Sequence, residues 1–81
     1  MNTESINEVI AKRLRAVIKI NNVNISHLAI KSGVSRGTIT NYMNLKRQPT
    51  LCMLADIANG LGVPISFLFG EGNENLNINE G

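Results

Sequence analysis

The chain has little cysteine, histidine and aromatic content. Its 81 residues include one cysteine, one histidine, one tyrosine and two phenylalanines, and no tryptophan. A lone cysteine cannot form an internal disulfide, which fits a reducing compartment. One histidine and one cysteine also fall short of the roughly four ligands of a structural zinc site. Three scattered aromatic residues do not form a stacking platform for single-stranded nucleic acid. We therefore expect no metal and no cofactor.

Long apolar runs are missing as well. No stretch approaches the roughly 20 apolar residues that a membrane span needs. The first four residues, Met1 to Glu4, contain neither the basic region nor the apolar region of a signal peptide. We therefore expect a cytoplasmic protein that does not interact with membranes.

Acidic residues are absent from the middle of the chain. Residues 9–55 contain all eight lysines and arginines and none of the six acids, so the stretch has a formal charge of +8 against +2 for the chain. Such a block repels itself unless a polyanion supplies the missing charge. A solvated basic surface is the other interpretation, and we expect it for most of helix one. The basic residues are Lys12, Arg13, Arg15, Lys19, Lys31, Arg36, Lys46 and Arg47.

Apolar spacing is helical through the first seventy residues and predicts an all-α bundle of five helices. The first helix starts at a Ser5/Glu8 capping box and ends near Ile20. Thr50 caps the fourth, Gly62 ends it, and Cys52 in its first turn is expected to be a small packing residue. A fifth short helix follows Pro64. The expected inner faces are Ile6, Val9, Ile10, Leu14, Val17 and Ile18 in the first helix, and Leu51, Leu54, Ile57, Ala58 and Leu61 in the fourth.

We expect one domain, residues 1–70, followed by an acidic tail, residues 71–81. The tail is polar and poor in large apolar groups, which predicts disorder. The alternation at Leu76, Asn77 and Ile78 leaves open a short strand that pairs with a second subunit.

Residues 24–44 carry the most informative pattern: two short helices joined by one tight turn. Gly33 can take the positive φ of a helix C-terminus, and Ser35 can cap the helix that follows. Leu28 and Ala29 are expected on the inner face of the first of these helices. Val34, Ile39 and Tyr42 are expected to point inward from the turn and the second. The positions left outside form a polar stripe that can meet DNA base edges, at Arg36, Gly37, Thr40, Asn41 and Asn44.

These features resemble the lambda-repressor-like family of helix-turn-helix proteins, from about residue 6 to residue 70. The matching positions are Leu28-Ala29, Gly33-Val34-Ser35, Ile39, Pro49, Leu54, Ile57-Ala58, Leu61-Gly62-Val63 and Leu68. The resemblance implies a five-helix bundle, dimeric binding to operator DNA and control of transcription. Four positions depart from the family pattern: Ile25 replaces a frequent glutamine, His27 and Met43 replace glutamates, and Leu45 replaces a frequent glycine.

Carried over position by position, the resemblance assigns base readout to Arg36, Gly37 and Asn41, with Thr40 beside them. Arginine can bind guanine through two donors and asparagine can pair with adenine, whereas Gly37 would permit close approach. Phosphate contacts are expected from Asn24, Ser35, Thr38, Asn44, Lys46 and Arg47. The last helix is more apolar than a surface helix requires, so a dimer contact is expected at Ile65, Phe67, Leu68 and Phe69.

The sequence therefore favours a sequence-specific double-stranded DNA-binding regulator of transcription, a repressor that acts as a homodimer with residues 36–44 in the major groove. The alternative is a protein-interaction module or antitoxin whose basic face meets an acidic partner. An enzyme is disfavoured because no acid, base and nucleophile converge. His27 is expected to be exposed to solvent or near a phosphate.

Overall fold

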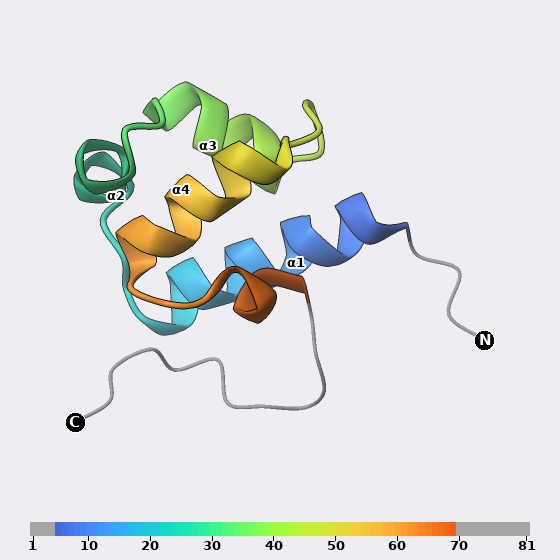
Figure 1. Ribbon diagram of the computed structural model, residues 1–81, viewed down its shortest axis with the longest axis horizontal. Coiled ribbons are helices and arrows are strands. Elements are labelled where there is room, and N and C mark those ends of the chain that lie inside the picture. The colour runs from blue at the N-terminus through green and yellow to red at the C-terminus, as the bar shows by residue number, and fades with distance from the viewer. Residues whose placement is uncertain (1–4, 70–81) are drawn as a thin grey trace.

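A computed structural model of the chain describes residues 5–69, and these fold into four α-helices and one terminal 3₁₀ turn. The helices are α1 (Ile6–Ile20), α2 (Ile25–Ser32), α3 (Arg36–Met43) and α4 (Leu51–Leu61), and the turn is η1 (Ile65–Phe69). In Figure 1, α4 lies between α3 on one side and α1 with η1 on the other. None of the helices in this described part is long and apolar enough to cross a membrane. The predicted tail, with its candidate strand, lies outside the described residues.

Local capping sets the helix boundaries. The Ser5 side chain accepts a hydrogen bond from the Glu8 amide (3.2 Å), and Glu8 accepts one from the Ser5 amide (2.9 Å), which confirms the capping box. Thr50 caps α4 through the Met53 amide (3.1 Å). Gly62 ends α4 in the left-handed region, at φ 77°. Each cap pairs an amide or carbonyl that the helix cannot satisfy internally.

The prediction of a fifth α-helix is wrong, because η1 is a single 3₁₀ turn of five residues. In η1 the Phe67 amide donates a hydrogen bond to the carbonyl of Pro64, three residues earlier (3.0 Å). A segment this short gains too few hydrogen bonds to offset the cost of starting an α-helix. Burial of Leu68, which is fully inaccessible to solvent, holds the turn in place instead.

One apolar core joins all five elements. It contains most of the expected inner residues of α1 and α4, and also Ala11, which the predicted stripe omitted; Val9 is only partly buried. Leu28, Val34, Ile39 and Tyr42 contribute from α2, the turn and α3.

Three expectations about burial are wrong. Ile6 and Leu51 are 57% and 67% exposed, respectively. Both lie in the first turn of a helix, where side chains tilt toward the N-terminus and away from the packed middle of the helix. Cys52 is exposed rather than packed. At about 100° per residue it lies on the opposite side of α4 from Leu54 and Ala58.

Candidate nucleic-acid interface

The turn between α2 and α3 is fixed by its own hydrogen bonds. Gly33 ends α2 at φ 76° and donates its amide hydrogen to the Ala29 carbonyl (2.9 Å). The amide of Val34 donates to the Ser32 hydroxyl (3.2 Å), and the hydroxyl of Ser35 accepts from the Thr38 amide (3.1 Å). The predicted roles of Gly33 and Ser35 are confirmed. With both ends satisfied, the angle between α2 and α3 is fixed locally.

The inner face of the α2–α3 unit packs into the core. Leu28 is 2% exposed and Ile39 is fully buried, with Val34 and Tyr42 buried beside them. Ala29 is only partly buried but packs against the same core. α3 therefore has one side committed to the protein, which orients its other side toward solvent.

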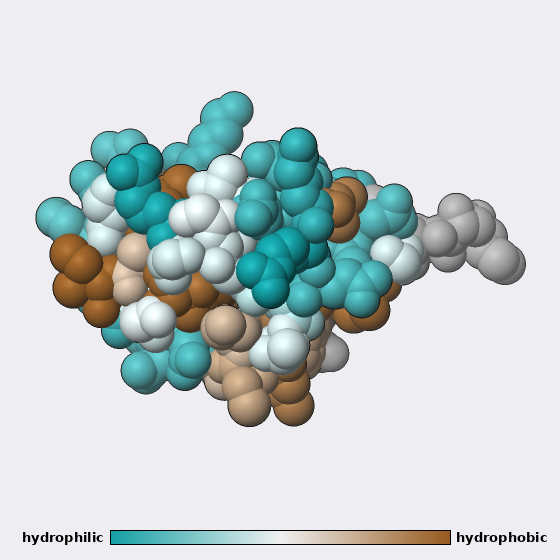
Figure 2. Space-filling view, turned by 90° about the horizontal axis from the view of Figure 1, so that it is seen from above, coloured by the Kyte–Doolittle hydropathy of each residue, from teal (hydrophilic) through white to brown (hydrophobic). Residues whose placement is uncertain are grey.

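The predicted polar stripe does lie on that other side. Arg36, Gly37, Thr40 and Asn44 are exposed, whereas Asn41 is half-buried. Figure 2 looks onto the molecule from the α3 side, and hydrophilic and intermediate residues cover much of that face. α3 therefore presents an exposed and largely polar face to solvent.

Two of the residues expected at phosphates bind each other at the start of α3. The Ser35 hydroxyl donates to the Thr38 hydroxyl oxygen (2.8 Å) while accepting from the Thr38 amide. The hydroxyl proton of Ser35 is therefore occupied, whereas that of Thr38 remains available to an acceptor outside the protein. Similarly, Asn24 caps α2 through its side-chain oxygen, which accepts from the His27 amide (3.1 Å), and this leaves its NH₂ group as a donor.

The C-terminal end of α3 receives an arginine from α1. Nη1 of Arg15 donates a hydrogen bond to the carbonyl of Met43, the last residue of α3. A cation at this end also interacts favourably with the helix dipole. Arg15 was expected on the surface of the first helix without such a contact. Its sequence separation of 28 residues from Met43 gives no local signal for the contact.

Arg13 also contacts another part of the protein itself. Its Nε donates to the carbonyl of Phe67 (2.9 Å), and its guanidinium lies 5.6 Å from the centre of the Phe67 ring. This combination of a hydrogen bond and a cation–π contact ties η1 to α1.

The loop after α3 contains a left-handed leucine. Leu45 has φ 61°, at the position where the resembling family frequently has glycine. The following amide, of Lys46, donates to the carbonyl of Asn41 (2.8 Å), so this conformation closes the end of α3. Lys46 and Arg47 are exposed directly beyond it. Ile25, at the glutamine position, packs against the core and offers no polar group.

The expected dimer contact loses one member. Leu68 is fully buried in the core of the chain itself, so it is not available to a second subunit. Ile65, Phe67 and Phe69 are partly buried and pack against the same core. A 3₁₀ turn repeats every three residues, so Phe67 and Phe69 point to other sides of the turn than the inward-facing Leu68.

Other chemistry is sparse in residues 5–69. This part of the chain contains no cluster of three or more histidine, cysteine, aspartate or glutamate side chains that could hold a metal ion. His27 is exposed, as expected.

Comparison with known proteins agrees with this geometry. A helix-turn-helix family model matches residues 12–68, which include all of α2, the turn and α3. No curated protein and no solved structure gives a significant match. Since the family match covers well over half of the chain, the chain belongs to the lambda-repressor/Cro-like helix-turn-helix family of DNA-binding regulators.

Proposed function

We propose that this protein is a sequence-specific transcriptional repressor that binds double-stranded operator DNA with α3 in the major groove. The supporting observation is the two-sided character of α3. Ile39 on one side is fully buried, while Arg36 and Thr40 on the other are exposed. A helix anchored in this way presents a fixed set of side chains to base edges.

Arg36 is the proposed principal base reader. It is the first residue of α3, and its side chain is exposed. A guanidinium can reach O6 and N7 of guanine with two hydrogen bonds. Asn41 is half-buried one turn further on, so it can pair with adenine only if the groove approaches α3 closely. Thr40 lies beside it.

Gly37 fits such a close approach. A methyl group added at Gly37 would meet no atom of the protein within 4 Å. Glycine is a poorer helix former than alanine, and the open space around Gly37 means that internal packing does not explain its presence. A missing side chain on the exposed side of α3 would let the helix sit deeper in the groove.

Phosphate contacts would surround this helix. We propose donors from the Thr38 hydroxyl, the Asn24 NH₂ group and the exposed cations Lys46 and Arg47. The amide end of α3 also favours an anion. Ser35 and Asn44 complete the set at the two ends of α3, where Ser35 acts mainly by orienting Thr38.

Dimerisation would provide the selectivity that one short helix lacks. α3 has eight residues and reads only a few base pairs. Two copies related by a two-fold axis would read half-sites about one helical turn, roughly 34 Å, apart. We place the contact at Ile65, Phe67 and Phe69.

A gel shift with random genomic fragments, followed by selection of bound sequences, tests the proposal. Enrichment of a palindromic motif is the expected result. The block of positive charge also suits an acidic protein partner, as in an antitoxin or an interaction module. In that case DNA would bind only as a polyanion, and selection would enrich no motif.

A further inference from the structure

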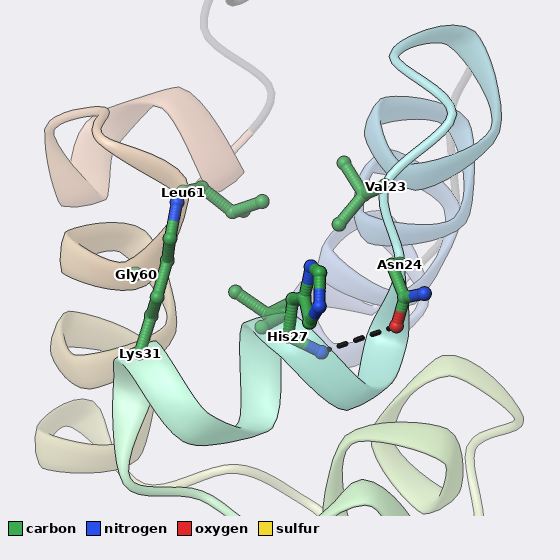
Figure 3. Close-up of a pocket in the computed structure, with 7 residues that line it drawn as sticks. Val23, Asn24, His27, Lys31, Gly60 and Leu61 are labelled. Atoms are coloured by element: carbon green, nitrogen blue, oxygen red, sulfur yellow. Dashed lines mark hydrogen bonds between the residues drawn. The ribbon is translucent and has the colours of Figure 1, made fainter.

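A cleft of about 220 Å³ lies between α2, the end of α4 and the linker that precedes α2. Its lining residues are Val23, Asn24, His27, Leu28, Lys31, Gly60 and Leu61. In Figure 3 the Lys31 side chain extends along α4 toward Leu61, and the His27 ring stands between it and Val23. The space is smaller than most drug-sized pockets, so it suits a ligand of a few heavy atoms.

The cleft combines basic nitrogen atoms with apolar walls. Lys31 and His27 are one helical turn apart on α2, and no carboxylate lines the cleft. Within residues 5–69 neither of their side chains has a hydrogen bond or an ion pair. Leu28 and Leu61 are buried beneath them. Asn24 adds only its NH₂ group as a donor, because its oxygen caps α2.

The close approach of α2 and α4 shapes this site. A methyl group at Gly60 would lie 3.0 Å from Cδ1 of Leu28 and 3.0 Å from Cβ of Ser32. Glycine at this position therefore allows α4 to pack tightly against α2 beside the cleft. The basic residues of α2 and Leu61 of α4 thus line the cleft from two helices in close contact.

We infer that this cleft binds a small organic acid with a short apolar end. The carboxylate would pair with Lys31 Nζ and accept a hydrogen bond from a ring N–H of His27. The apolar end would lie against Val23 and Leu61. The site uses none of the base-reading side chains of α3 and does not need the Asn24 NH₂ group that is proposed to contact phosphate, so it is a second site beside the DNA interface.

The test is a titration of the full chain, followed by backbone amide NMR, with sodium butanoate as the probe. Butanamide is the neutral control of the same shape, and sodium chloride controls for ionic strength. We expect saturable shifts confined to the amides of residues 23–31 and 60–61 with butanoate alone. Lys31→Met keeps the apolar stem and removes the charge, so it should weaken binding about tenfold or more. Lys19→Met, an exposed lysine on α1, should leave binding unchanged.

Three results would overturn the inference. One is a linear drift of shifts shared with sodium chloride or butanamide. Another is equal affinity in the wild type and Lys31→Met. The third is displacement of bound butanoate by a saturating DNA duplex, which would assign the cleft to backbone phosphate. The amide spectra report at the same time whether each variant remains folded.

Discussion

Gly60 of α4 faces Ser32 of α2 so closely that a Cβ atom at position 60 would lie 3.0 Å from the Ser32 Cβ and 3.2 Å from its backbone nitrogen. Backbone and a Cβ atom cannot move aside as a flexible side-chain end can. Gly60 therefore sets the distance between α4 and the helix that supports α3.

Gly60→Ala should destabilise the fold. The substitution gains up to about 1 kcal/mol of helix propensity but overpacks the α2–α4 contact, which costs about 1–3 kcal/mol. We expect a net loss in the free energy of unfolding, measured by urea denaturation. An alanine variant as stable as the wild type would show that α2 and α4 can separate freely.

Gly37→Ala is the matched substitution on the DNA-facing side. Nothing lies within 4 Å of the added methyl, so the free energy of unfolding should stay constant or rise by up to about 1 kcal/mol. If α3 sits deep in the groove, operator affinity should nevertheless fall. Operator affinity can be measured by fluorescence anisotropy. Undiminished binding by Gly37→Ala would contradict the proposed close approach of α3 to the groove.

Leu45→Gly should relieve backbone strain. A leucine in the left-handed region costs about 1–2 kcal/mol, which exceeds the entropic cost of glycine, about 0.5–1 kcal/mol. Leu45→Ala is the control, since it loses the same side-chain contacts but keeps the strain. We expect Leu45→Gly to have a higher melting temperature than Leu45→Ala. The reverse order would contradict the claim that Leu45 is strained.

The sequence predicted those parts of the fold that depend on neighbouring residues. Ser5, Ser35 and Thr50 cap their helices as expected, because a cap bonds to an amide within three residues. Gly33 and Gly62 end their helices because each takes the positive φ of a helix end, which is a local property of the residue. The inner positions of α3 followed from helical periodicity.

Features that depend on distant parts of the chain were not predictable. Periodicity placed Ile6 and Leu51 on the inner faces of their helices but could not show that side chains at these helix starts are exposed. The contact of Arg15 with the end of α3 joins residues that share no sequence pattern. The apolar residues after Pro64 predicted an α-helix. The segment forms a 3₁₀ turn instead because it is short and because Leu68 is buried.

Lys46→Ala tests the proposed phosphate contacts. If Lys46 neutralises one phosphate, its removal should reduce the slope of log affinity against log salt by about 0.9 and weaken all sequences alike. Lys19→Ala is a suitable control because Lys19 is an exposed lysine of α1 that is not among the proposed contacts. A salt slope unchanged from the wild type would place Lys46 outside the interface.

Binding-site selection with the wild type and Arg36→Ala examines the proposed readout most directly. If the exposed guanidinium at the start of α3 binds guanine, the variant should lose about 1–3 kcal/mol at the cognate site and lose preference at one position of each half-site. Affinity for unrelated DNA should change less. Recovery of the same motif from the alanine variant, with the same information at every position, would contradict base readout by Arg36.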